Sequence, residues 1–449
     1  MRRRTPFAAV LAANTVSTAG TSLTLIGVPW FVLQTTGSAG RAGIVAFCAT
    51  LPIVVSALVA GPLIDRLGRR RVAIGSDLLC ALAVAAIPLL HRADLLAFWA
   101  LCALVAVSGF AHTPGNTARY VLLPDLAEAA GTTLARAAGL LDAVGRGSRM
   151  AGAALAGVLI SLTGPASVLL MDAATFGISA LILGIGLRGF RAAAPDTGRQ
   201  PVSLRTYRSE LREGYGYLLG NRLLLGIVLL AMLMNGTDQG WGAVLLPVHA
   251  EESLGGATAI GLLTALFGAG GLAGALLYGA YGARFSRRRV LGVCAVLSGA
   301  PRFLVAATTH SVAPLAVTMV CAGVAAGSLN PILSTVIYER VPDALRSRVS
   351  GALTAGCELA MPVGGLAAGL LVDGAGVRGA LLLTGGLFVL ATLGPFVFPV
   401  WREMDADPAA GVASPPVPPA PRVPPASPVL SSWGRLRRGP GRRARTPRP

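Results

Sequence analysis

Apolar stretches alternate with short polar or glycine- and proline-rich breaks along most of this chain. A helix needs about 20 largely apolar residues to cross the hydrocarbon core of a bilayer, and stretches of that length recur along the chain. The pattern therefore predicts an all-α membrane protein with twelve transmembrane helices. Their expected bounds are 8–33, 42–63, 72–91, 95–116, 138–163, 166–187, 222–247, 258–282, 290–309, 313–337, 350–373 and 379–400.

The twelve helices divide into two groups of six, because the longest internal connection follows the sixth. Three sequence features return at one fixed offset of 218 positions (287 − 69). Since six is an even number, the second group starts on the same side as the first, which predicts two parallel six-helix repeats related by an axis along the membrane normal. The recurring pairs are Arg69-Arg70-Arg71-Val72 with Arg287-Arg288-Arg289-Val290, Pro29 with Pro247, and Leu123-Pro124-Asp125 with Val341-Pro342-Asp343.

We therefore expect four regions. They are an N-terminal six-helix bundle (1–187), a cytoplasmic central loop (188–221), a C-terminal six-helix bundle (222–401) and a disordered, Pro/Arg-rich cytoplasmic tail (402–449). The tail is too poor in apolar residues to fold by itself.

Composition supports the membrane interpretation. Of the 449 residues 54% are hydrophobic and only 13% charged, whereas soluble domains carry about 25% charged residues. The net charge of +18 would suggest a nucleic-acid partner in a soluble protein, but here the arginines lie in alternate connections between apolar spans. The positive-inside rule then places both termini in the cytoplasm. Every basic residue is Arg and none is Lys, and with the Ala, Gly and Pro excess this suggests a bacterial genome, so we expect the spans in a bacterial inner membrane.

Residue patterns for enzyme chemistry are absent from the sequence. The four histidines are scattered, the six cysteines lie singly, and no metal, nucleophile or nucleotide motif is present. We expect neither an enzyme nor a bound cofactor or metal, so transport would draw on an ion gradient or on the substrate gradient itself.

The most specific motif lies in the connection after the second span. Its glycines, Gly61 and Gly68, are expected to shape a tight turn, while Asp65 accepts hydrogen bonds from arginines or a helix end. Such a cluster could latch one half of the protein against the other; the alternative is a plain topology signal. The segment reads Gly61-Pro62-Leu63-Ile64-Asp65-Arg66-Leu67-Gly68-Arg69-Arg70-Arg71.

At these residues the sequence resembles the major facilitator superfamily, whose signature between helices two and three has the form G-x-x-x-D-R-x-G-R-R. It is most similar to the branch of bacterial drug exporters that includes macrolide-efflux and siderophore-export proteins, which are twelve-span proton antiporters. The resemblance extends to about Trp401 and implies the major facilitator fold. It is also carried by Leu25 to Leu33, by Asn116 to Leu126 after helix four, and by Glu339 to Val349 after helix ten.

The sequence departs from that family pattern at three places. Ala283 stands where Asp65 would repeat in the second half, so only the first copy has the acid. Thr21 follows Gly20 at a place where relatives often carry an aspartate. Gly152-Ala153 replaces the usual Gly-Pro of helix five, which weakens the argument for export from that motif.

Ionisable residues within spans cost about 2.5–3.5 kcal/mol each at the bilayer centre and therefore need a reason. Asp238 lies in mid-helix with no basic residue near it in its span, which makes it the first candidate for proton coupling or substrate binding. Glu358 and Asp172 are the alternatives, and Arg149, which matches a basic position of the family's helix five, is a candidate counter-charge.

Two further acids are expected to serve the structure. Asp77 should pair with the latch arginines or with Arg119, and Asp142 should form an i,i+4 ion pair with Arg146. The predicted latch set is Gly61, Asp65, Arg66, Gly68, Arg69, Arg70, Asp77 and Arg119.

Together these features predict a monomeric secondary transporter that exports a small amphipathic compound against proton entry by alternating access. Its expected partners are the small-molecule substrate, protons and the lipid bilayer. Uptake or facilitated diffusion of a small metabolite remains open within transport, and a membrane enzyme or sensor remains the alternative from another class.

Overall fold

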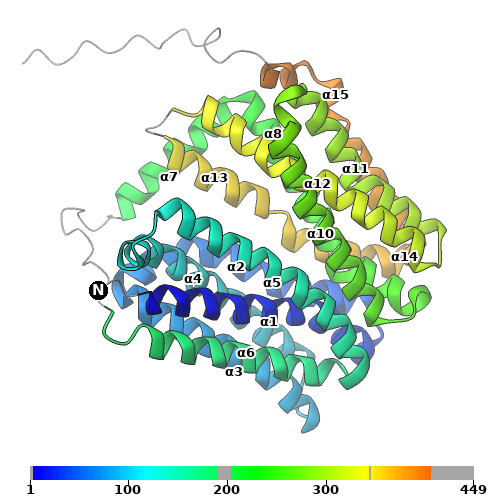
Figure 1. Cartoon of the computed structure of the whole chain (residues 1–449). Helices are drawn as coiled ribbons and strands as arrows, with labels where there is room; N and C mark the ends of the chain where they lie inside the picture. The colour runs from blue at the N-terminus through cyan, green and yellow to red at the C-terminus, as the bar shows by residue number, and fades with distance from the viewer. Residues whose placement is uncertain (1–3, 191–203, 343–344, 406–449) are drawn as a thin grey trace, which may run out of the picture. The chain divides into compact units, whose positions relative to one another are not determined.

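The computed structural model describes residues 4–190, 204–342 and 345–405, and these are helical with no β-strand (Figure 1). The first half contains six long helices, each running the length of a membrane span. They are α1 (Thr5–Thr36), α2 (Ala39–Leu67), α3 (Arg69–Arg92), α4 (Phe98–Ala130), α5 (Leu134–Thr163) and α6 (Pro165–Gly186).

The second half repeats this order after an additional helix, α7 (Leu204–Gly220). Its seventh span is one continuous helical rod in which two short π-helical segments interrupt the α-helix. That rod consists of α8 (Arg222–Gly240), η1 (Trp241–Leu245), α9 (Leu246–His249) and η2 (Ala250–Leu254). The next three spans are α10 (Ala257–Tyr281) with the 3₁₀ turn η3 (Gly282–Arg284), α11 (Arg287–Thr308) and α12 (Val312–Arg340).

The last two spans are formed by α13 (Arg346–Glu358) and α14 (Met361–Thr392). Gly376 inside α14 has φ 71° and ψ 169°, a conformation open to glycine, and it divides α14 between spans eleven and twelve. The chain then continues through α15 (Gly394–Val397) and the 3₁₀ helix η4 (Pro399–Asp405).

By length and composition alone, ten helical segments among the described residues could cross a membrane. The last of them, Arg348–Val397, is 50 residues long and contains the Gly376 break, so it accounts for two spans. The 30-residue α5 is not among the ten, and it carries Asp142, Arg146 and Arg149. The architecture thus agrees with twelve transmembrane helices.

The two halves pair their helices in the same way, as the sequence repeat predicted. In the first half α4 packs against α2 and α3, and in the second half α12 packs against α10 and α11. Likewise α1 packs against α5, and its counterpart α8 packs against α13 and α14.

Helix bounds differ from the sequence prediction mainly at the side of the bundle where α1 begins, here called the terminal face. There α4 continues to Ala130, so the segment from Asn116 to Leu126, expected in a loop, is helical. The central connection also contains α7, where the sequence predicted only a loop; Tyr217 of this helix donates a hydrogen bond of 2.9 Å to the carbonyl of Arg340.

The first four residues of the predicted tail, 402–405, belong to the helix η4, which packs back on the second half. Trp401 and Met404 are buried, and the Trp401 ring lies against Gly226 of α8. The rest of the predicted tail, residues 406–449, lies outside the described residues.

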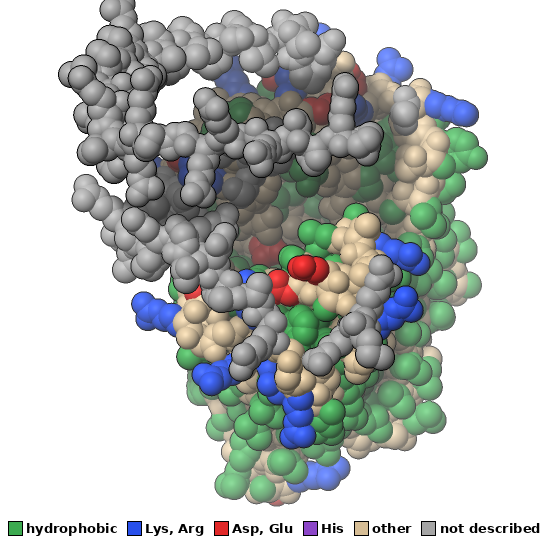
Figure 2. Space-filling model, turned by 60° about the vertical axis from the view of Figure 1, so that its left-hand side comes forward, with side chains coloured by type: hydrophobic (Ala, Val, Ile, Leu, Met, Phe, Trp, Pro, Cys, Tyr) green, Lys and Arg blue, Asp and Glu red, His purple; other side chains and the backbone are tan. Residues whose placement is uncertain are grey.

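Arginine side chains gather at the terminal face. Figure 2 turns the side that carries the N-terminus forward and shows blue basic side chains around it, with hydrophobic side chains covering the flank. The chain contains no lysine, so these groups are all arginines. This asymmetry is the feature on which the positive-inside rule operates.

The two halves meet at the opposite side, here called the distal face, through glycines that allow helices to touch. A Cβ on Gly157 of α5 would lie 2.6 Å from the carbonyl oxygen of Ala257, and one on Gly261 of α10 would lie 2.7 Å from that of Ala153. Such small residues permit close helix contact in membranes.

The same principle joins α2 to α14, where a Cβ on Gly369 would lie 2.6 Å from the carbonyl oxygen of Ala39. Beside that contact the carboxylate of Asp373 accepts hydrogen bonds of 3.1 and 3.2 Å from the amide of Gly40. At these two helix pairs the halves therefore meet through bare backbone surfaces with few polar bonds.

We predict that Gly157→Leu separates α5 from α10, because the added side chain overlaps backbone atoms that cannot move independently. Ser161 and Thr258 share a hydrogen bond across this contact, so cysteines at these two positions should cross-link readily in an otherwise cysteine-free protein. The Gly157→Leu change should reduce that cross-linking severalfold. Gly139→Leu on the same helix, where a Cβ meets open space, should leave it unchanged.

Candidate functional site

A buried ion pair ties together four helices of the first half. The Nη2 of Arg119 lies 2.6 Å from both carboxylate oxygens of Asp77, and the two side chains are only 3% and 5% exposed. Ser179 of α6 donates a hydrogen bond of 2.7 Å to Asp77, and Ser17 of α1 accepts a longer one of 3.5 Å from Arg119. Of the two partners predicted for Asp77, the structure selects Arg119.

The predicted latch motif is mostly helical. Helix α2 continues through Gly61 and ends at Leu67, so Gly61 does not form a turn as expected. The whole turn is Gly68, whose φ of 87° lies in the region that glycine favours. Asp65 and Arg66 are exposed at the end of α2, and neither forms a hydrogen bond or ion pair with a described residue.

Other residues of the motif hold the ends of neighbouring helices. Arg69 pairs at 2.7 Å with Asp125 of α4, and Arg70 donates a hydrogen bond of 2.8 Å to the carbonyl of Gly184, in the last turn of α6. An arginine at a helix C-terminus satisfies carbonyls that have no partner within the helix. In this conformation the acid that the arginines engage is Asp125 and not Asp65.

Asp172 is fully buried on α6 and lies against α1. Its carboxylate accepts hydrogen bonds from the hydroxyls of Thr24 and Thr175, and it has no basic partner among the described residues. Gly20 makes the space for it, because a Cβ at that position would overlap Asp172 and Thr175. The first half thus places the carboxylate of Asp172, from α6, against α1, a helix that has no acidic residue of its own.

Asp238 has a basic partner on another span, although the sequence offers none close to it in its own. It forms an ion pair with Arg302, which lies on a different span, α11. The sequence argument considered only residues in the same helix, whereas neighbouring helices supply most partners of a membrane acid. The side chain of Asp238 is 45% exposed, while that of Arg302 is only 3% exposed.

Arg302 lies within a ring of aromatic side chains from four elements. Its guanidinium carbon is 5.0 to 6.0 Å from the ring centroids of Trp241, Phe267, Phe303 and Phe388. Aromatic faces attract a cation within about 6 Å and do so more strongly when water is excluded. The buried Nε of Arg302 and Nε1 of Trp241 have no acceptor among the described residues.

The remaining predicted residues lie apart from this pair. Glu358 is half-buried at the break between α13 and α14, beside the point where Asn235 donates a hydrogen bond of 2.9 Å to the Cys357 carbonyl. Arg149 is exposed and forms no ion pair with Asp172, Asp238 or Glu358. The predicted counter-charge is therefore not in place in this conformation.

Asp142 does not form the predicted pair with Arg146. It accepts a hydrogen bond of 3.0 Å from the hydroxyl of Tyr120 on α4, and the side chains of Asp142 and Arg146 are both exposed. Spacing within one helix permits an i,i+4 pair, but a partner on the next helix competes for the same acid.

Sequence reasoning missed the aromatic ring around Arg302 and the threonines around Asp172. One signal was available, since Asp238 lies 218 positions after Gly20 and occupies the equivalent place in the second repeat. Each half therefore places one carboxylate at this position, from α6 in the first half and from α8 in the second.

Comparisons with known proteins agree with this architecture. The sequence model of the Major Facilitator Superfamily matches residues 10–240 and 228–442. The "Multidrug efflux pump Tap" of Mycobacterium tuberculosis is 32% identical over 419 residues, which is 92% of this chain and 98% of that protein. "Macrolide efflux protein A" of Streptococcus pyogenes is 22% identical and covers 89% of this chain and 97% of its own length.

Solved structures show the same fold at low sequence identity. The nucleoside transporter NupG superposes with a TM-score of 0.72 and 15% identity over 88% of this chain and 99% of its own. A bacterial homologue of the iron transporter ferroportin, solved in an inward-facing state, gives a TM-score of 0.66 and 16% identity over 90% of this chain and 99% of its own.

We predict that Asp77→Ala destabilises the protein by about 3–5 kcal/mol, because it leaves the Arg119 charge buried without its partner. Asp125→Ala breaks the pair with Arg69, which is 26% exposed, and should cost about 1 kcal/mol or less. Thermal unfolding of both variants in detergent compares the two pairs directly. Equal losses of stability in the two variants would show that the buried pair contributes no more to stability than the exposed pair.

Proposed function

Since this chain belongs to the major facilitator superfamily, we propose that it is a proton-coupled transporter that exports small amphipathic drugs by alternating access. Its resemblance to two efflux proteins over nearly their whole length supports export and the drug-like substrate class. The fold supports transport of a small molecule between two six-helix repeats, with sites near the bilayer midplane.

The observation that carries the proposal is the unequal burial of Asp238 and Arg302. The surrounding aromatic side chains hold Arg302 independently of Asp238, so the cation stays in place when the ion pair separates. The half-exposed carboxylate, in contrast, can exchange protons with water. A proton on Asp238 removes its charge and weakens the pair, which links proton binding to the ion pair that joins α8 to α11.

A substrate with a positive charge can compete for the same carboxylate. When Asp238 is ionised, it can turn from Arg302 to an amphipathic cation, and when it is protonated it attracts neither. The proton and the substrate would thereby exclude each other, which is the requirement for exchange transport. Asp172, buried among hydroxyls at the equivalent place, is the second candidate, and Glu358 at the helix break is the third.

The remaining features complete the proposal. The terminal face is cytoplasmic, as its arginines favour, so both termini lie on the cytoplasmic side of the bacterial inner membrane. The functional units are the bundles 1–187 and 222–401, joined by the connection 188–221 and followed by the tail 402–449. A single copy suffices, because both repeats are present in one chain.

We predict that Asp238→Asn abolishes uphill drug export in proteoliposomes with an imposed pH gradient, while downhill exchange continues. Asparagine resembles the protonated acid in shape and cannot release a proton. Asp142→Asn removes an exposed membrane acid that contacts a tyrosine and should pump normally. If Asp238→Asn also pumps normally and Glu358→Gln or Asp172→Asn does not, the proton role belongs to that residue.

The latch is also part of the proposal. Asp65 lies exposed near the arginines in this conformation, and we propose that it engages a helix end or an arginine when the terminal face closes. The present structure, whose halves touch at the distal face, would then hold the latch open.

We predict that Asp65→Asn retains near-normal expression but transports several times more slowly, because the closed state loses a charged hydrogen bond. Asp94→Asn provides the control, since it removes an exposed acid at the distal face. Wild-type transport by Asp65→Asn would reduce the motif to a topology signal.

A further inference from the structure

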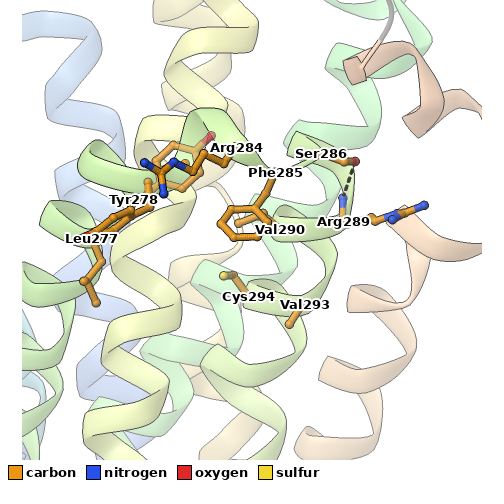
Figure 3. Close-up of a pocket in the computed structure, with 11 residues that line it drawn as sticks. Leu277, Tyr278, Arg284, Phe285, Ser286, Arg289, Val290, Val293 and Cys294 are labelled. Carbon is orange, nitrogen blue, oxygen red and sulfur yellow. Dashed lines mark hydrogen bonds between the residues drawn. The ribbon is translucent and has the colours of Figure 1, made fainter.

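The second copy of the latch motif forms a pocket of about 550 Å³ between α10, η3 and α11 (Figure 3). It lies at the terminal end of these helices. Relative to the first copy, the acid at Asp65 has become Ala283, and Leu63 and Leu67 have become Tyr281 and Phe285. The copy has therefore lost its negative charge and gained aromatic surface.

Two of the four arginines in this copy are already engaged. Arg287 forms an ion pair with Glu339, and Arg288 donates hydrogen bonds to the carbonyl oxygens of Pro395 and Phe396 at 2.7 and 3.0 Å. These contacts parallel those of Arg69 and Arg70 in the first half. The two half-buried arginines of the copy therefore already have partners.

The other two, Arg284 and Arg289, line the pocket and have no acidic partner among the described residues. Figure 3 shows their side chains on either side of Phe285, and the guanidinium of Arg284 lies 5.4 Å from the ring centroid of Tyr281. The nearby carboxylate of Asp405 is occupied, because it accepts hydrogen bonds from the Ser286 hydroxyl and the Arg288 amide.

Below these cations the pocket is apolar and open. Leu277, Tyr281, Phe285 and Val293 are 47–62% exposed, although they belong to or border membrane-spanning helices. Helices α10 and α11 each pack against α12 more extensively than against each other, which leaves a groove between them. Apolar side chains left open at this depth contact lipid in a bilayer.

We propose that this pocket binds an anionic phospholipid from the leaflet at the terminal face. The headgroup phosphate lies at the rim with Arg284 and Arg289, and an acyl chain follows the groove past Leu277 and Val293. Basic pockets between membrane helices are suited to such headgroups. Because the two cations flank Phe285 and do not converge, a lipid with two phosphates can contact both.

Two other occupants fit the pocket less well. The chain's own tail, residues 406–449, carries eight arginines and a single acid, so it has the same sign of charge as the rim. A free phosphate would match the arginines but would leave the apolar groove without a ligand.

The test measures lipid retained by the purified full-length protein, using native mass spectrometry with cardiolipin, phosphatidylglycerol and phosphatidylcholine. We expect binding to decrease in that order. Arg284→Gln/Arg289→Gln should weaken cardiolipin binding by about tenfold or more. Arg136→Gln/Arg188→Gln, which removes two exposed charges of the first half at the same face, should have little effect.

A second variant keeps the test independent of charge. Val293→Trp fills the groove and should reduce cardiolipin binding while the arginines remain. Equal binding of the three lipids, equal losses in the two double variants, or full displacement of cardiolipin by millimolar inorganic phosphate would each overturn the proposal. None of these outcomes depends on drug export, so the lipid site and the proposed function are tested separately.

Discussion

An arginine buried in an apolar interior is the constraint around which each half of this protein is built. A charge removed from water needs a partner, and the two halves meet that need in different ways. Arg119 has a carboxylate and two serines around it, with every group buried. Arg302 has one carboxylate open to its surroundings and a ring of aromatic faces.

That difference separates a structural pair from one that can change. Releasing Asp77 from Arg119 would leave two buried charges and break contacts among α1, α3, α4 and α6, so this pair ties the four helices together. Releasing Asp238 leaves a cation that still has four aromatic neighbours and an acid that can reach water. Proton uptake is therefore compatible with the second pair and costly for the first.

Features that depend on residues close together in the sequence could be predicted, whereas features that depend on contacts between helices could not. Helix number, the repeat and the arginine asymmetry depend on local composition and fixed spacing, and the structure agrees with them. Two predictions were wrong: that the fourth helix ends at Asn116, and that Gly61 forms a turn. Sequence rules place loops at polar residues even where a helix extends beyond the membrane.

The surroundings of the membrane acids are set by residues on other helices, and the spacing of residues along the sequence does not reveal these contacts. Asp238 looked isolated because its partner is 64 positions away, on another span. Asp172 looked the weaker candidate because the vacancy at Gly20 that accommodates it is visible only in three dimensions. The pairing of Asp77 with Arg119 was one of the two alternatives that the sequence offered, because both residues lie near the same face.

The glycine contacts at the distal face have a consequence for reversibility. Helices that touch through bare backbone gain many small dispersion contacts, each about 0.1–0.2 kcal/mol, and lock no long side chains in place. Apart from the bonds of Asp373 to Gly40 and of Ser161 to Thr258, the described contacts leave no polar group stranded when the halves part. Closure of this kind has a shallow free-energy minimum, so a modest difference in ligand binding is enough to reverse it.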